Sequence, residues 1–361
     1  PTSVTRHAAM RLAAHRSARP LLPLLRPRHL FSNRRVHEAA RSGFAGGRAV
    51  AYDAARPEYT PAAVEWLLGG VLRNHADVAS DGEAIRSLNS SSSSSSSASR
   101  SVGPRHDVLD LGAGTGKLTR AILQERPGLR VVGVDPETEM CVAYGKALAE
   151  AELTADVLQG TAEKIPLLDS SVGCVVAGQS FHWFATNNVL EEISRVLVPG
   201  GALGLVWNTR DTRVPWVKAL EDVIAPFYDG EGKGIRGSSG SGSSSVPRQQ
   251  SGEWKKLFED MASQSDSLTS ENSGDHINSN NSPRLFEPLE SKTLSKADPV
   301  TEDELVDHVL SLSVIAAQGS NVRRDVAARV RGILANDPSV EQIGSDQDKS
   351  EDARILLPFI T

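Results

Sequence analysis

The segment that decides the fold is VLDLGAGTGK, residues 108–117, in which a short apolar run breaks into alternating glycines. The apolar run predicts a buried strand, and apolar residues at helical spacing over 117–125 predict a helix behind it. Glycines let the backbone between the two elements turn sharply and approach a ligand without obstruction by a Cβ atom. The amides at the start of the helix then face that ligand. The segment therefore predicts a ligand-binding loop at the end of a strand.

The chain after this loop continues the alternation of strand and helix. Apolar runs at 130–134, 157–158, 172–176 and 202–207 are separated by helical segments at 138–149 and 188–197. Further elements are expected as a strand at 284–289, a helix over 301–312 with a Thr301–Glu304 capping box, a helix at 322–334 and a strand at 354–360. The run 172–176 is apolar throughout, as in a strand covered on both faces. The pattern predicts an α/β fold with a doubly wound, mostly parallel sheet of seven strands and helices on both faces.

The composition is that of a soluble globular protein. A net charge of −6 argues against nucleic acid as a partner, because phosphate binding needs concentrated Lys and Arg. No apolar run approaches the roughly 20 residues that span a bilayer, so no membrane partner is expected. The two cysteines, Cys141 and Cys174, lie in apolar stretches, which indicates a reduced compartment without a disulfide framework. We expect a monomer.

Three classes of ligand use a glycine loop between a strand and a helix. A phosphate-binding P-loop requires G-x-x-x-x-G-K-[ST], but Leu111 and Leu118 stand at its first glycine and its hydroxyl. A dinucleotide fingerprint requires G-x-G-x-x-G, and Lys117 stands where the third small residue should be. This lysine disfavours a dinucleotide as the ligand but does not exclude it.

The third class is closest, because the loop resembles the D-x-G-x-G-x-G signature of the S-adenosylmethionine methyltransferases. The resemblance implies a Rossmann-like methyltransferase sheet with S-adenosylmethionine as cofactor. It also implies that an acid and the loop amides hold the amino-acid end of that cofactor. The residues concerned are Asp110, Gly112, Ala113, Gly114 and Gly116.

Other positions extend this cofactor site. Asp135 follows the second strand, where a carboxylate accepts both ribose hydroxyls of an adenosyl group, although NAD would use it equally well. Met140 stands where the family places an apolar residue against adenine; ordinary helix core is the alternative. Residues 160–166, GTAEKIP, resemble the family's adenine-edge segment, with the backbone near Ala162 contacting the base.

An acceptor site is predicted at the end of the apolar run 172–176, since ligands bind at the carboxyl ends of strands in open α/β sheets. Residues 177–184, AGQSFHWF, resemble the Q-x-F-H-W segment of small-molecule methyltransferases related to trans-aconitate methyltransferase, a branch of the type 11 group. Residues 52–59, YDAARPEY, resemble the Y-x-x-x-R-P-x-Y lead-in of that branch. The resemblance places Gln179 at the cofactor and implies that Tyr52, Arg56 and Trp183 bind the acceptor.

The chemistry of methyl transfer leaves two roles open for His182. The leaving group is neutral, so positioning and desolvation supply most of the rate and no metal is expected. A carboxylate acceptor needs no base, whereas a hydroxyl or amine needs one, and the ordinary pKa of histidine near 6.5 suits that role. His182 and Trp183 can equally do no more than shape the pocket. Arg56 suits a carboxylate, through a two-pronged hydrogen bond.

The expected function is S-adenosylmethionine-dependent methylation of a small-molecule acceptor, with a carboxylate as one candidate. The alternatives are an NAD(P)-dependent oxidoreductase and a non-catalytic protein that binds an adenosyl ligand.

The expected domains follow the composition. Residues 1–48 hold ten arginines against one acid and predict a basic leader, either disordered or directing the protein to mitochondria or plastids instead of the cytoplasm. Residues 49–80 should form an N-terminal lid helix, and 81–105 a Ser-rich linker. The methyltransferase domain is expected over 106–361, with a low-complexity insertion at 230–283.

Overall fold

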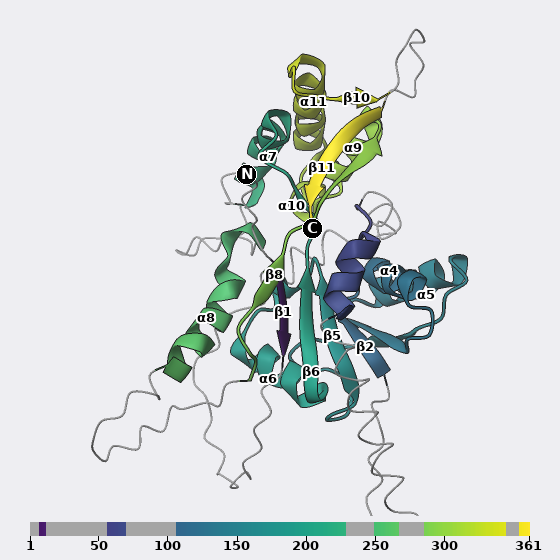
Figure 1. Ribbon diagram of the computed structural model, residues 1–361. Coiled ribbons are helices and arrows are strands. Elements are labelled where there is room, and N and C mark those ends of the chain that lie inside the picture. The colour runs from purple at the N-terminus through teal and green to yellow at the C-terminus, as the bar shows by residue number, and fades with distance from the viewer. Residues whose placement is uncertain (1–6, 12–55, 70–105, 229–248, 267–284, 344–353) are drawn as a thin grey trace, which may run out of the picture. The chain divides into compact units, whose positions relative to one another are not determined.

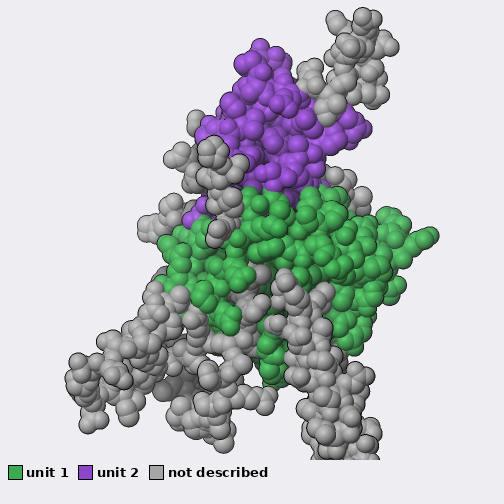
Figure 2. All heavy atoms as spheres, in the orientation of Figure 1, with its two compact units in different colours: residues 1–14, 58–207, 252–294 green, residues 15–57, 208–251, 295–361 purple. Residues whose placement is uncertain are grey.

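The computed structural model describes residues 7–11, 56–69, 106–228, 249–266, 285–343 and 354–361. The chain divides into two compact units (Figure 2). Unit 1 comprises residues 1–14, 58–207 and 252–294; unit 2 comprises 15–57, 208–251 and 295–361. The range 106–361, expected to be the methyltransferase domain, thus includes residues of both units.

Unit 1 is built on a seven-stranded sheet with the strand order β4-β3-β2-β5-β6-β1-β8 (Figure 1). Its parallel strands are β2 (His106–Leu111), β3 (Val131–Asp135), β4 (Asp156–Gln159), β5 (Val172–Gly178) and β6 (Leu197–Val206). At one edge β1 (His7–Arg11) pairs antiparallel with both β6 and β8 (Glu290–Lys292). The predicted mostly parallel, doubly wound sheet is confirmed.

Three details of this sheet differ from the expectation. The strand after the second insertion lies at Glu290–Lys292 instead of 284–289. His7–Arg11 is a strand within the leader that was expected to be disordered or a targeting segment. The strand at Arg354–Ile360 has the expected bounds but belongs to unit 2. Strands pair through backbone groups, so the side-chain pattern of a strand does not identify its partner.

Successive side chains of a strand point to opposite faces of the sheet, and here both faces are apolar. Helices cover both of them. On one face α6 (Asn187–Val196) and α8 (Glu253–Asp266) form a core with Leu109 and Leu111 of β2. On the other face α4 (Lys117–Glu125), α5 (Thr138–Glu150) and the helix at 61–69 pack with Val108. Each large apolar side chain buried there contributes about 1.5–3 kcal/mol.

The expected lid segment contains a core helix. Of residues 49–80 the structure describes 56–69, and the helix spans 61–69. Its Val64, Leu67 and Leu68 are each 1% exposed. A Cβ atom added to Gly204 of β6 would lie 2.6 Å from the Leu67 Cδ1 atom, so this helix packs tightly on the sheet.

The predicted low-complexity insertion at 230–283 contains a core helix at Glu253–Asp266, around residues 254–258, the one piece that the sequence indicated as able to dock. Residues 249–251 form the short helix η2 (Gln249–Ser251), and α8 follows. Trp254 and Phe258 of α8 are 3% and 4% exposed and belong to the core on the α6 face.

Unit 2 is an antiparallel sheet with helices. The strands are β7 (Thr209–Arg210), β9 (Ser295–Val300), β10 (Gln342–Ile343) and β11 (Arg354–Ile360). The helices are α7 (Pro215–Tyr228), α9 (Glu302–Leu310), α10 (Ser313–Ala316) and α11 (Ser320–Asn336). The capping box is confirmed: the Thr301 hydroxyl accepts the Glu304 amide at 3.1 Å, and the Glu304 carboxylate accepts the Thr301 amide at 2.8 Å.

Candidate functional site

The glycine loop turns directly from β2 into α4. Gly112, Gly114 and Gly116 have φ angles of 71°, 55° and 79°, a region that disfavours L side chains. A Cβ atom on Gly112 would also lie 2.7 Å from the Ser180 Cβ atom, so a glycine is required there for space as well. A Cβ atom on Gly114, by contrast, would meet no described atom within 4 Å. The loop is therefore packed at one glycine and open at the next.

Asp135 lies beside the open part of this loop. Its Oδ2 atom accepts the Gly114 amide at 2.9 Å, and its Oδ1 atom accepts the Glu137 amide at the same distance. Burial raises the pKa of Asp135, while these two amide hydrogen bonds oppose the rise. Two residues that the sequence analysis assigned to the cofactor, 21 positions apart, are thus brought into direct contact.

Asp110 lies below the loop, on the face of the sheet that α4 and α5 cover. Its side chain is 1% exposed and accepts a hydrogen bond from the Thr119 hydroxyl at 2.8 Å. The Tyr144 hydroxyl in turn donates to Thr119 at 3.1 Å. Burial raises the pKa of Asp110 to about 7, although the Thr119 hydrogen bond opposes it. These contacts stabilise the loop from beneath, and a direct contact of Asp110 with the cofactor stays a prediction.

The residues predicted to contact adenine flank the end of β3. Met140 on α5 is 3% exposed, and Ala162, which follows β4, is 6% exposed. The Gly160 amide donates to the Asp135 carbonyl at 3.1 Å, which joins the segment after β4 to the end of β3. Ala113 in the loop is 9% exposed, and its amide donates to the Val134 carbonyl at 3.1 Å.

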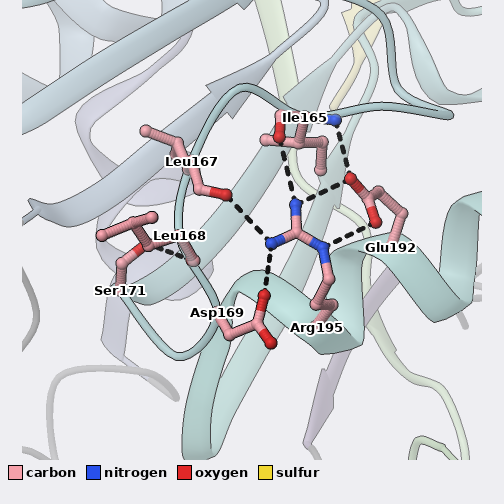
Figure 3. Close-up of polar contacts among 7 residues, drawn as sticks. All are labelled: Ile165, Leu167, Leu168, Asp169, Ser171, Glu192 and Arg195. Carbon is pink, nitrogen blue, oxygen red and sulfur yellow. Dashed lines mark hydrogen bonds and ion pairs between the residues drawn. The ribbon is translucent and has the colours of Figure 1, made fainter.

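Arg195 of α6 holds the segment that carries Ala162 (Figure 3). Its guanidinium donates to the carbonyls of Ile165 at 3.1 Å and Leu167 at 2.9 Å. It also pairs with Glu192 and Asp169, each at 2.7 Å. Glu192 accepts the Ile165 amide at 2.9 Å, and the hydrogen bonds from Arg195 lower its pKa. Arg195 could not be recognised from the sequence, because nothing in its neighbourhood indicates carbonyl partners about 30 positions away.

The acceptor segment begins at the end of β5 and is tied to the glycine loop. Gln179 has a φ angle of 56°, a strained value of the kind that often occurs at functional sites. Its backbone N–H donates to the Val206 carbonyl at 2.9 Å. The Ser180 hydroxyl donates to the Leu111 carbonyl at 2.8 Å. The turn η1 (Phe181–Trp183) follows, and the structure thus brings the two motifs of the sequence analysis together.

His182 lies in this turn and contacts the end of the next strand. The Trp207 indole N–H donates to the His182 Nδ1 atom at 3.2 Å. The Trp183 ring centroid lies 5.2 Å from that of His182. His182 and Trp183 are both half-buried. Trp207 had no predicted role in the site.

Tyr59, the last residue of the lead-in motif, is a further site residue for which no role was predicted. A Cβ atom on Gly178 would lie 2.6 Å from the Tyr59 hydroxyl, so this side chain lies against the carboxyl end of β5. Glu58 forms an ion pair with Lys117, the first residue of α4. The lead-in is therefore connected to the start of α4 through Glu58 and to the end of β5 through Tyr59.

Two further residues, Arg56 and Tyr52, were predicted to bind the acceptor. Arg56 belongs to unit 2 and is half-buried, and Tyr52 lies outside the described residues. Their roles stay predictions. In the described part of the chain, no group of three His, Cys, Asp or Glu side chains is placed to hold a metal ion. No helix in that part is long and apolar enough to cross a membrane.

Comparison with known proteins matches residues 109–205 to a family described as "Methyltransferase domain". An uncharacterized methyltransferase of Mycobacterium tuberculosis is 40% identical over 179 residues, which cover 50% of this chain and 58% of the relative. An uncharacterized methyltransferase of Schizosaccharomyces pombe is 36% identical over 173 residues, covering 48% and 55%. A trans-aconitate 2-methyltransferase of an Azoarcus species is 33% identical over 133 residues, covering 33% and 51%.

The matched part of this chain therefore spans between half and three fifths of the length of these relatives. The family match begins within β2 and ends in β6, so it contains the glycine loop, Asp135 and the turn η1. Residues 109–205 thus match a methyltransferase domain, and the match contains the residues predicted to bind the cofactor.

Proposed function

We propose that this chain transfers the methyl group of S-adenosylmethionine to a small-molecule acceptor, and that the acceptor is a carboxylic acid. One observation carries the cofactor half of this proposal. Open space beside Gly114 adjoins the Asp135 carboxylate, which is held 2.9 Å from the Gly114 amide. Backbone amides and a carboxylate next to an open volume suit a ligand with a polar amino-acid end and a ribose diol.

Each predicted cofactor residue has a role in this proposal. The backbone of Gly112–Gly116 holds the amino-acid end, with Asp110 supporting the loop. Asp135 accepts the ribose hydroxyls, Met140 and Ala162 flank adenine, and Gln179 closes the site from β5.

A dinucleotide fits this loop less well. Lys117 occupies the position of the third small residue, and its side chain, 12% exposed, is ion-paired with Glu58. A dinucleotide fingerprint has a small residue here, which permits close packing of helix on strand.

The carboxylate half of the proposal is supported by charge and by resemblance. Arg56 is suited to a carboxylate through paired hydrogen bonds. The Q-x-F-H-W segment and the similarity to a protein named trans-aconitate 2-methyltransferase favour the same branch. Transfer to a carboxylate gives a methyl ester and requires no base.

Calorimetry and a turnover assay test the two halves separately. The purified protein should bind S-adenosylmethionine and S-adenosylhomocysteine and bind NADH poorly; tighter binding of NADH would overturn the cofactor assignment. Tritiated S-adenosylmethionine with a panel of di- and tricarboxylic acids should then give base-labile products. Binding without turnover on any metabolite would favour a ligand-binding protein, and a base-stable product would overturn the ester.

The remaining expectations about the whole protein are proposals as well. We propose that it is a monomer that binds neither nucleic acid nor membrane. We also propose that it acts in the cytoplasm, unless the basic leader 1–48 directs it to mitochondria or plastids. Size-exclusion chromatography with light scattering checks the first proposal. Fluorescent fusions with and without 1–48 check the second, since a loss of organelle signal on deletion would identify the leader as a targeting segment.

A further inference from the structure

The hydrogen bond between Trp207 and His182 determines which ring nitrogen of the histidine carries a proton. An indole N–H can only donate, so the His182 Nδ1 atom, 3.2 Å away, must accept. A neutral imidazole that accepts at Nδ1 has its proton on Nε2. A doubly protonated ring would present an N–H to the indole N–H. The contact therefore selects the Nε2–H form of a neutral ring.

Both partners of this hydrogen bond are held in place. Trp207 is 1% exposed and packs on Trp254 of α8, with ring centroids 4.6 Å apart and planes tilted by 30°. The turn that carries His182 is attached on one side by the Ser180–Leu111 hydrogen bond. On the other side the backbone N–H of Gln179 donates to the carbonyl of Val206, the residue before Trp207. The Trp207 ring and the backbone that carries His182 are therefore both fixed in position.

We propose that His182 meets the methyl acceptor as an Nε2–H hydrogen-bond donor and not as a general base, and thereby selects acceptors with a carboxylate. The proposal rests on the function proposed above. Nε2 lies on the ring edge directed away from Trp207, and any group that contacts it there must accept a hydrogen bond. His182 is half-buried in the turn that follows β5, and the Ser180–Leu111 hydrogen bond ties this turn to the glycine loop, so the turn lies where ligands bind in open α/β sheets.

The proton balance of the reaction favours the same class of acceptor. A carboxylate oxygen bonds to the methyl carbon as the S–CH₃ bond breaks, and the electron pair of that bond stays on sulfur. The products are an ester and a neutral thioether, and no proton is released. A hydroxyl or ammonium acceptor must lose a proton, which an imidazole already protonated on Nε2 cannot take through that nitrogen. A charged acceptor also strengthens the N–H···O bond.

Nitrogen-15 NMR of the full chain with labelled histidine tests the tautomer without any acceptor. We expect the His182 signals, assigned by their loss in His182→Ala, to show Nε2 protonated and Nδ1 unprotonated at neutral pH. Trp207→Phe removes the donor while keeping an aromatic ring, and should allow the other tautomer or the protonated form to appear. Trp183→Phe, which changes the other ring beside His182, should leave the tautomer unchanged. A protonated Nδ1 in the wild-type protein would overturn the proposal.

Kinetics with two substitutions test the role in transfer. Glutamine keeps an N–H donor near the position of Nε2 but cannot take a proton. His182→Ala should raise the KM of a carboxylic acid about 10- to 100-fold with kcat nearly unchanged, as expected for one charge-assisted hydrogen bond, and His182→Gln should restore most of the loss. A fall in kcat of about 10²–10⁴ in both variants would identify a base and overturn the proposal.

The two failures are distinguishable. A wild-type protein that methylates no acid contradicts the proposed function, whatever the NMR result. A protein that methylates acids but has the other tautomer contradicts this inference alone.

Discussion

At the scale of single residues, Asp135 joins the end of β3 to the glycine loop, because its carboxylate accepts the Gly114 amide. The same carboxylate is our candidate for the ribose hydroxyls. Asp135→Ala removes both interactions and should weaken binding of S-adenosylmethionine by about 1–3 kcal/mol, the cost of losing hydrogen bonds to a charged group. Calorimetry measures this change. The matched control is Asp222→Asn, an exposed acid of unit 2, which should leave the affinity unchanged.

A second residue-scale prediction concerns the buried acid Asp110, whose pKa is raised to about 7 from 3.8. A folded-state pKa above the unfolded value means that the folded state holds its proton longer. Between about pH 4 and 7 the free energy of unfolding should therefore fall as the pH rises, by about 4 kcal/mol in total from this group.

Asp110→Asn cannot ionise but keeps an oxygen for the Thr119 hydroxyl. The decline in its free energy of unfolding between pH 5 and 8, measured by urea titration, should be smaller than in the wild-type protein. Parallel curves for the two proteins would show that Asp110 does not titrate in this range.

At the scale of elements, the segment between β4 and β5 depends on α6 for its position. Arg195 holds two carbonyls of that segment and two carboxylates (Figure 3). Arg195→Ala leaves those carbonyls without their donor and should lower the free energy of unfolding by about 1–3 kcal/mol. It should also weaken cofactor binding, because Ala162 lies in the same segment.

Arg331→Ala is the matched control for Arg195→Ala. Arg331 also pairs with two acids, Glu302 and Asp303, but on the surface of α9 and α11, where ion pairs contribute little. Chemical denaturation and calorimetry should show an effect for Arg195 alone. Equal effects in both variants would contradict the role assigned to Arg195.

A second element-scale prediction concerns α8. Phe258 is 4% exposed, and its ring stacks on Phe181 with centroids 5.8 Å apart. Phe258→Ala should cost about 3–5 kcal/mol of stability, as for other large-to-small core substitutions. Val142→Ala, at an exposed position of α5, should change the melting temperature little. A small effect for Phe258 would mean that α8 is not part of the core.

At the scale of the whole molecule, the composition of a segment indicates whether the chain needs that segment for folding. The serine run at 90–97 has no apolar side chain to bury. Deleting it should change the stability by less than about 1 kcal/mol, since loop length affects closure entropy only weakly. Cofactor affinity should stay the same. A drop of many degrees in the melting temperature would show that the run packs against the protein.

Local signals in the sequence were enough to predict most of the elements of the fold. The glycines at 112, 114 and 116 have the positive φ angles that a sharp strand-to-helix turn requires. The Thr301–Glu304 capping box acts within four residues of chain. Buried parallel strands are continuous apolar runs, which is why β3 and β5 were recognisable. These features depend on backbone conformation and on burial, and both leave a local pattern.

Tertiary structure alone decided which distant residues meet. The apolar pattern of 354–360 predicts a strand but does not identify its sheet, and β11 pairs within unit 2. Trp254, which lies in a sequence rich in polar residues, belongs to the core. Trp207 and His182 were each visible in the sequence, yet their hydrogen bond, and with it the proton on Nε2, follows only from the pairing of β5 with β6. The chemistry of a side chain determines which kinds of group it can bond. Which partner it meets depends on packing between segments far apart in the chain.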